Sequence, residues 1–295
     1  MQPLSYVLVT AARNEAEHIE KTLTAVVSQT IRPQRWIIVS DGSTDDTDTI
    51  VKHYSQLHPW IKLLHVNNGP EHSFRKKARA QNAGYEVLKK FPFEAIGFLD
   101  GDTSVPPDLF EYLLAKFAED PSLGVAGSPY VVGGDDMGAR RSYDQQQVSG
   151  ACQLFRRECF EQIGGFTELE MGGEDTVAIV LARMNGWRTR SFLGRRLIVH
   201  KAVGFGDKRR TLRDKFLSGY RNYVLGNSLI WEVGRGLYQM TRRPYVSGGF
   251  SLLMGYMYAL VSRARSGVPA PVRMQVRQEQ HRRIRTLLFS RHSIG

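Results

Sequence analysis

Two short apolar runs near the start of the chain are each followed by a polar turn and then by apolar residues at helical spacing. Residues 6–10 and 36–39 have the nearly continuous apolar character of strands buried on both faces. After the first run and its turn, Ile19, Leu23 and Val26 recur at the spacing of one helix face. Two strand–turn–helix units in succession predict a parallel sheet with right-handed crossovers, in which the polar turns lie at the carboxyl edge.

A third apolar run, residues 95–99, ends on Asp100, Gly101 and Asp102. As another strand of the same sheet, it would place two carboxylates at the edge where ligands bind in open α/β folds. Carboxylate oxygens suit divalent cations and the phosphates that accompany them. Because Asp-Gly-Asp is also an ordinary surface turn, the tripeptide by itself leaves both interpretations open.

A second acidic pair, Glu174 and Asp175, precedes apolar residues of helical character. The helix dipole favours acidic residues in a first turn, which is the purely structural explanation for this pair. Just upstream, residues 157–166 predict a short helix that is closed by Gly164 and Gly165.

Taken in order, these segments and their neighbours resemble the motifs of the inverting family 2 glycosyltransferases. The matching segments are residues 10–15, 39–45, 77–84, 100–102, 164–166 and 174–175. The resemblance covers roughly residues 4–200 and implies a GT-A fold, which is an α/β architecture with a mostly parallel sheet flanked by helices and a Rossmann-like nucleotide-binding half. Each segment alone is a weak signal, and their order and spacing carry the identification.

The resemblance assigns the two N-terminal turns to the nucleotide. The residues it places against the base and ribose are Thr10, Ala11, Arg13, Glu15 and Asp41. A carboxylate such as Asp41 can accept a hydrogen bond from N3 of uracil, so a UDP-sugar is the expected donor. Many relatives carry an aromatic residue at the position of Ala12, and base stacking is therefore assigned to no residue here.

The resemblance also supplies candidates for the diphosphate and the metal ion. Lys77 and Arg79 would contact the diphosphate, although basic residues just before a helix over 80–88 equally fit a solvated helix start. Asp102 would bind Mg²⁺ or Mn²⁺, while Asp100 with the adjacent Gly101 would contact the ribose or metal-bound waters.

Two further roles follow from the same family pattern. His200 ends an apolar run and would join the metal, with an ordinary structural histidine as the alternative. Asp175 would be the general base that takes the proton of the acceptor hydroxyl, because an inverting transfer is a single in-line displacement that needs one base. Glu174 would orient the acceptor or cap the helix, and sequence alone leaves the two carboxylates interchangeable.

Charge is distributed unevenly along the chain, whose formal net charge is +11. Residues 201–295 hold 18 basic and 4 acidic residues, whereas residues 1–200 hold 22 and 25. This asymmetry favours a catalytic domain over residues 1–205 and a helical, basic extension over residues 206–295.

The extension contains an uncharged apolar segment, residues 248–261, between arginine pairs. Its 14 residues are fewer than the roughly 20 that cross a bilayer. It fits either an interfacial or re-entrant segment at an anionic membrane or a core helix that packs under the catalytic domain.

We therefore expect a cytoplasmic enzyme, peripheral on the inner face of the membrane, that uses a nucleotide-sugar in surface polysaccharide synthesis. Its acceptor would be lipid-linked or a polysaccharide, and a homo-oligomer is compatible with the composition. Two alternatives are a nucleotidyltransferase, which would show a glycine-rich turn after the first strand, and a basic nucleic-acid-binding protein, for which no motif is present. The two cysteines lack metal-type spacing and fit a reducing compartment, and no signal peptide is evident.

Overall fold

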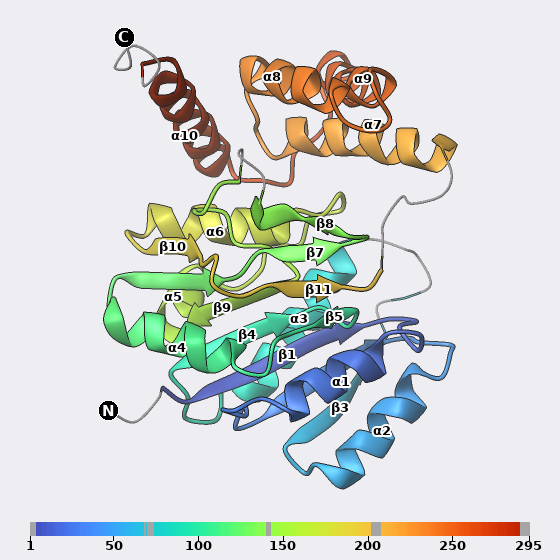
Figure 1. Cartoon of the computed structure of the whole chain (residues 1–295), viewed down its shortest axis with the longest axis vertical. Coiled ribbons are helices and arrows are strands. Elements are labelled where there is room, and N and C mark those ends of the chain that lie inside the picture. Colours follow the sequence, from blue (N-terminus) through green and yellow to red (C-terminus); the bar gives the residue numbers. More distant parts are fainter. Residues whose placement is uncertain (1–3, 68, 70–73, 140–142, 202–207, 290–295) are drawn as a thin grey trace. The chain divides into compact units, whose positions relative to one another are not determined.

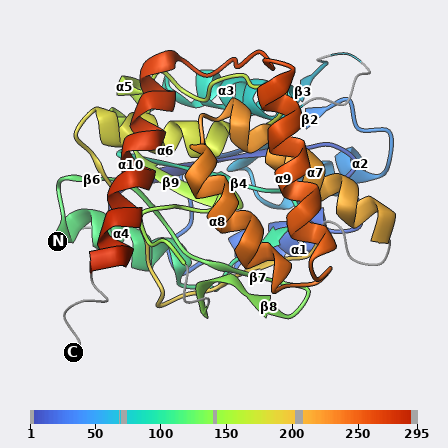
Figure 2. The ribbon, with the colours of Figure 1, turned by 90° about the horizontal axis from the view of Figure 1, so that it is seen from above.

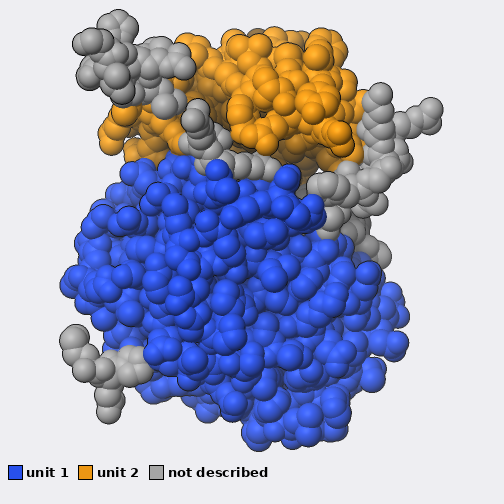
Figure 3. Space-filling model, in the orientation of Figure 1, with its two compact units in different colours: residues 1–168, 174–202 blue, residues 169–173, 203–295 orange. Residues whose placement is uncertain are grey.

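The computed structural model describes residues 4–67, 69, 74–139, 143–201 and 208–289. The chain divides into two compact units (Figure 3). The first unit comprises residues 1–168 and 174–202, and the second comprises residues 169–173 and 203–295. The domain boundary expected at residue 205 lies outside the described residues.

A twisted central sheet organises the first unit (Figure 1). Within the described residues it has seven strands, in the order β10 (Arg188–Ser191), β6 (Leu123–Gly127), β9 (Cys152–Arg156), β4 (Ala95–Leu99), β1 (Tyr6–Ala12), β2 (Trp36–Asp41) and β3 (Ile61–Val66). All neighbours pair in parallel except β9, which is antiparallel to both β4 and β6. The mostly parallel sheet expected from the strand–turn–helix units is therefore confirmed.

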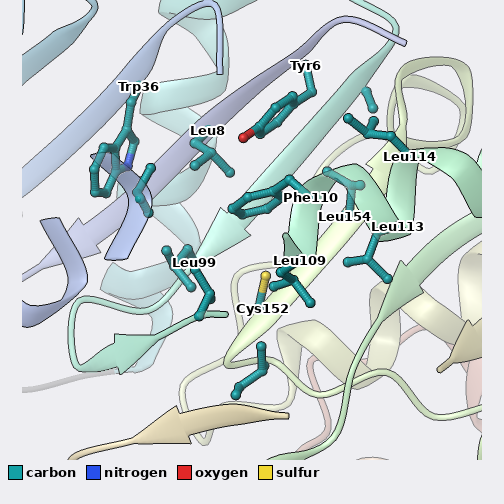
Figure 4. Packing of buried hydrophobic residues seen from close by; sticks show 14 of the residues in the cluster. Tyr6, Leu8, Trp36, Leu99, Leu109, Phe110, Leu113, Leu114, Cys152 and Leu154 are labelled. Carbon is teal, nitrogen blue, oxygen red and sulfur yellow. The ribbon is translucent and has the colours of Figure 1, made fainter. Parts of the chain in front are cut away.

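Helices cover both faces of this sheet because its strands are apolar on both sides. The helices of one face are α1 (Ile19–Val27), α2 (Thr47–Leu57) and α4 (Leu109–Glu119), and those of the other are α3 (Phe74–Leu88), α5 (Arg157–Gln162) and α6 (Glu174–Met184). Tyr6 and Leu8 of β1 belong to the first core and Val7 and Val9 to the second, as the alternation of a strand requires. Figure 4 shows Leu8 and Tyr6 packed near Phe110 of α4.

A second, smaller sheet follows the Asp-Gly-Asp turn. Among the described residues its strands run in the order β5 (Thr103–Ser104), β11 (Leu197–Val199), β7 (Tyr130–Val132) and β8 (Asp135–Asp136), the last followed by a 3₁₀ turn, η1 (Met137–Ala139). The antiparallel register of β5 and β11 sets Val199 opposite Thr103. Residues some hundred positions apart are thus brought next to each other beside Asp102.

The second unit is helical, as expected for the C-terminal extension. Its described helices are α7 (Lys208–Val224), α8 (Leu229–Met240), α9 (Ser247–Val261) and α10 (Ala270–Phe289). Figures 1 and 2 both show α8 between α9 and α10. Helix α9 approaches α7 very closely, because a Cβ on Gly255 would overlap the carbonyl oxygen of Phe216, and one on Gly219 that of Leu252.

A buried polar network also holds these helices together. The carboxylate of Glu232 on α8 accepts hydrogen bonds from the amides of Asn222 (2.8 Å) and Asn227 (3.2 Å). Gln280 of α10 donates to the side-chain oxygen of Asn227 at 2.8 Å, and the Tyr256 hydroxyl of α9 donates to the carbonyl of the same residue at 2.7 Å. Each of the four helices contributes to this network, so their packing is specific and not merely apolar.

Candidate active site

The two N-terminal polar turns meet at the carboxyl edge of the sheet, where β1 and β2 end side by side. They are joined by hydrogen bonds from Glu15 N to the Thr47 hydroxyl (2.8 Å) and from Thr44 N to the Asn14 side chain (2.8 Å). Desolvation acts to raise the pKa of Asp45 although its side chain is exposed, but hydrogen bonds from Thr47 and Ala16 together outweigh this and lower that pKa. The ionised carboxylate of Asp45 therefore connects the two turns through its hydrogen bonds with Ala16 and Thr47.

Residues expected at the nucleotide differ in their accessibility. The Thr10 side chain is fully buried and accepts a hydrogen bond from the Trp36 indole at 3.0 Å, so it supports the sheet from inside. Ala11 is half-buried near the end of β1 and Arg13 half-buried in the turn, while Asp41 is buried at the end of β2.

Glu15 lies under the Asp-Gly-Asp turn. A Cβ built on Gly101 would lie 3.5 Å from Glu15 Cγ. Glu15 Oε1 forms an ion pair with Lys201 Nζ at 2.9 Å. Its second oxygen, Oε2, is buried without a hydrogen-bond partner among the described residues. The carboxylate thus offers one unused acceptor close to the turn that ends β4.

Lys77 and Arg79, the two residues expected at the diphosphate, each form an ion pair with a carboxylate of the chain. Helix α3 begins at Phe74 and not near residue 80, so Lys77 and Arg79 both lie within its first turns. Lys77 Nζ forms a 2.6 Å ion pair with Asp100, whereas Arg79 pairs with Glu168 at 2.6 Å. The two cations therefore hold different carboxylates instead of converging on one point.

Burial and charge oppose each other in the Lys77–Asp100 pair. Burial acts to lower the pKa of Lys77, but Asp100 and Glu174 outweigh it and raise that pKa, so the ammonium stays charged. Burial raises the pKa of Asp100 to about 6, even though Lys77 acts to lower it. Lys77 consequently links the Asp-Gly-Asp turn electrostatically to the acidic pair of α6.

The β5–β11 pairing brings Asp102 and His200 together. The backbone N–H of His200 donates to the carbonyl of Asp102 at 2.9 Å, and His200 Nε2 forms a 2.7 Å hydrogen bond with the Ser104 hydroxyl. Burial, Lys21 and His18 together lower the pKa of His200. A neutral imidazole next to a carboxylate is a suitable donor set for a divalent cation, with Nδ1 as the nitrogen left for ligation.

These two residues cannot fill a metal's coordination sphere alone. No group of three or more His, Cys, Asp or Glu side chains is arranged to hold a metal in the part of the chain that the structure describes. Mg²⁺ and Mn²⁺, however, are commonly bound by one or two protein ligands together with substrate phosphates. Asp102 and His200 would suit such a shared site, in which a substrate diphosphate would supply the other oxygens.

Glu174 and Asp175 occupy distinct environments at the start of α6. Gly172 and Gly173 lead into the helix in the left-handed region (φ 75° and 97°), which explains the glycine pair. Glu174 is buried, and this burial raises its pKa despite the opposing charge of Lys77. Asp175 is half-buried, with Oδ1 accepting from Thr176 N at 2.7 Å.

Two residues that hold Asp175 were not singled out from the sequence. A Cβ on Gly150 would lie 3.0 Å from Asp175 Cγ and would overlap Oδ2, so the carboxylate rests directly against the backbone at that position. Gln153 of β9 is buried, and its amide donates to the carbonyls of Val148 (3.2 Å) and Asp175 (3.5 Å). A polar residue inside the otherwise apolar run 151–155 was the available signal for Gln153.

Comparisons with known proteins show the family to which the chain belongs. The family model "Glycosyl transferase family 2" matches residues 7–176. A poly-beta-1,6-N-acetyl-D-glucosamine synthase of Staphylococcus epidermidis is 32% identical over 133 residues, covering 44% of this chain and 29% of that protein. The synthase of the same name from Staphylococcus aureus strain COL is 33% identical over 123 residues, covering 41% and 27%. The match thus spans less than a third of the length of these relatives.

Solved structures show the same fold at low sequence identity. The mannosyltransferase PcManGT from Pyrobaculum calidifontis, in complex with GDP-Man and Mn²⁺, has a TM-score of 0.60 and 17% identity over 95% of this chain and 85% of that one. S. aureus TarS in complex with UDP-GlcNAc has a TM-score of 0.53 and 14% identity over 88% and 73%. The chain therefore belongs to glycosyltransferase family 2 and is a glycosyltransferase with the GT-A fold.

Proposed function

We propose that this glycosyltransferase transfers a sugar, with inversion, from a UDP-sugar to a hydroxyl of a polysaccharide or lipid-linked acceptor in surface polysaccharide synthesis. The observation that carries the proposal is the clustering at one sheet edge of Asp102 and His200 on one side and Glu174 and Asp175 on the other, with Lys77 interacting with both acidic motifs. Such a cluster could supply both a cation site and a general base.

The nucleotide would bind on the surface formed by the two N-terminal turns. Glu15 Oε2, which has no hydrogen-bond partner among the described residues, could accept a hydrogen bond from a ribose hydroxyl, and the carboxylate of Asp41 at the end of β2 could accept one from uracil N3. The name of the S. epidermidis synthase includes N-acetyl-D-glucosamine, and TarS was solved with UDP-GlcNAc. UDP-GlcNAc is therefore the first donor to test, with GDP-mannose as the comparison.

Asp102 and His200 are the residues proposed to hold Mg²⁺ or Mn²⁺. A cation bound there would offset the negative charge that grows on the departing diphosphate. Ser104 would keep the His200 ring oriented through its hydrogen bond to Nε2, as supporting partners of ligating histidines usually do.

Asp175 is proposed as the general base. It is more accessible than the buried Glu174, and its Oδ1 is held in place by Thr176 N. The carboxylate would accept the proton of the acceptor hydroxyl as that oxygen attacks the anomeric carbon opposite the diphosphate. Glu174 would remain as an internal partner for Lys77, which separates the two carboxylates that sequence alone could not distinguish.

The test combines product identification with two variants. Purified protein is given UDP-GlcNAc, Mn²⁺ and a short β-1,6-linked N-acetylglucosamine acceptor, and release of UDP is measured. Asp175→Asn should keep donor affinity while lowering kcat by about 10² or more. Asp102→Ala should abolish the Mn²⁺-dependent part of the thermal stabilisation by UDP, measured without any turnover.

Three results would count against the proposal. Release of pyrophosphate instead of UDP would indicate a nucleotidyltransferase. Equal loss of donor affinity and turnover in Asp175→Asn would assign that residue to donor binding. Unchanged activity of Asp102→Ala in chelator would remove the metal assignment.

A further inference from the structure

The second unit exposes an unusual amount of apolar surface on two neighbouring helices. We call it the α8–α9 apolar face, defined by Ile230, Val233 and Leu237 of α8 and Phe250, Met254 and Val261 of α9. The spacing within each helix places its three residues on one side. Ile230, Phe250 and Val261 are 68%, 60% and 78% exposed, so the face is open and not a half-covered core.

Helix α9 is already packed on its other sides. Gly255 and Leu252 contact α7, and Gly249 contacts the carbonyl of Gly236 on α8, which leaves no room for another side chain there. Leu253 is half-buried, and its side chain would meet any Cβ placed on Gly236. The segment 248–261 is therefore neither fully core nor fully exposed, since one side packs within the unit and the opposite side stays open.

Arginines border this face, and no charged residue interrupts it. Residues 244–262 contain no Asp, Glu, Lys or Arg, while Arg242 precedes them and Arg263 follows, both exposed. The Arg242 guanidinium donates to the Tyr238 hydroxyl at 2.9 Å and lies 5.3 Å from the centre of that ring. A tyrosine whose polar end carries an arginine is suited to the depth of lipid headgroups, where its ring meets the apolar region.

We propose that the α8–α9 apolar face docks into the boundary between headgroups and acyl chains of an anionic membrane. A second copy of this chain is a poorer occupant, because a symmetric contact would bring the arginine border against itself. An anionic bilayer instead offers apolar chains to the face and negative charge to its border. Each described helix is too short or too polar to span a bilayer, so the docking is interfacial. Docking of this kind is independent of the sugar and the acceptor that the enzyme uses.

The first experiment measures cosedimentation of the full chain with vesicles. Vesicles of phosphatidylcholine that contain about 30% phosphatidylglycerol are compared with vesicles of pure phosphatidylcholine, both at low and at high salt. Phe250→Asp should weaken binding to the anionic vesicles at least about tenfold, because it replaces an exposed aromatic side chain that docking would bury with a charged one. Leu57→Asp is the matched control, since Leu57 is equally exposed (60%) but lies on α2 of the catalytic unit.

A second experiment reports insertion directly and tolerates small effects on stability. Tryptophan is placed on the face as Phe250→Trp and on α2 as Leu57→Trp, and vesicles with brominated acyl chains are added. Fluorescence should be quenched more strongly for Phe250→Trp than for Leu57→Trp, because only the former enters the acyl region. Far-UV circular dichroism of all variants checks that the fold is kept.

Specific outcomes would overturn the proposal. One is failure of the wild-type chain to bind anionic vesicles at low salt. Another is equal binding by Phe250→Asp and Leu57→Asp, or equal quenching of the two tryptophans. If sedimentation velocity shows that Phe250→Asp converts a dimer to a monomer while vesicle binding is unchanged, the face is a contact between copies of this chain instead.

Discussion

Lys77 connects two acidic motifs that lie far apart in the sequence. It forms an ion pair with Asp100 and interacts electrostatically with Glu174 and Asp175. Arg79, two residues along the same helix, forms an ion pair of the same length with Glu168, but both of those side chains are more exposed. One helix therefore carries a cation at the site and another at the surface, and their energetic contributions should differ.

Replacing each cation with methionine separates these roles. Lys77→Met leaves Asp100 and Glu174 without their shared partner and should lower the free energy of unfolding by about 1–3 kcal/mol. It should also reduce kcat, because the carboxylates it held would repel one another. Arg79→Met should cost about 1 kcal/mol or less, since exposed ion pairs contribute little. Urea unfolding and steady-state kinetics measure both effects, and similar losses for the two variants would contradict the assignment.

Gly150 matters because it has no side chain that would displace Asp175. Because Asp175 rests against its backbone, Gly150→Ala should displace the carboxylate by roughly an ångström and lower kcat by about 10². The thermal midpoint should change little. In an Asp175→Asn background the same substitution should have little further effect, because the base is already lost. An undiminished effect in that background would show that Gly150 acts through another residue.

At the scale of whole elements, the close packing of α7 against α9 depends on glycines. Gly255→Ala introduces a methyl group against the carbonyl oxygen of Phe216 and should destabilise the chain by about 1–3 kcal/mol. Gly234→Ala on α8 is the control, because nothing lies within 4 Å of its added Cβ. Removing a glycine from a helix interior should there stabilise by about 0.5–1 kcal/mol. Denaturant unfolding should therefore show changes of opposite sign, and equal signs would refute the packing argument.

At the scale of the molecule, charge separates the catalytic part of the chain from its basic remainder. Residues 201–295 hold 18 basic and 4 acidic residues, so polyanions should be attracted mainly to this part. The exposed Arg282 and Arg285 of α10 can be compared with the exposed Lys52 and Lys62 of the catalytic unit.

The double variant Arg282→Gln/Arg285→Gln should elute from a heparin column at clearly lower salt than the wild-type chain. Lys52→Gln/Lys62→Gln changes the net charge equally and should elute nearly as the wild type does. The reason is that screening confines each charge's influence to about 10 Å, so local density matters more than the total. If both double variants shift the eluting salt concentration equally, the net charge of the chain alone sets its affinity for heparin.

Local sequence patterns were sufficient to predict several of the strands and helices. The apolar runs that became β1, β2 and β4 and the helix face of Ile19, Leu23 and Val26 could be recognised because burial follows the period of each element. The turns at the carboxyl edge followed from the parallel crossovers. The family motifs led correctly to the GT-A fold and to a glycosyltransferase, whereas the roles of the individual site residues remain predictions.

Tertiary structure alone decided how those segments meet. The antiparallel insertion of β9, the Lys77–Asp100 pair and the contact of Gly150 with Asp175 join residues separated by 23 or more positions, and no local pattern encodes such pairings. The sequence of α9 likewise does not show which of its apolar residues are buried, because they form one uniform apolar run. Which of them are buried depends on the glycines that let α7 and α8 approach from particular sides, because packing space is set by neighbouring backbones and not by the helix's own composition.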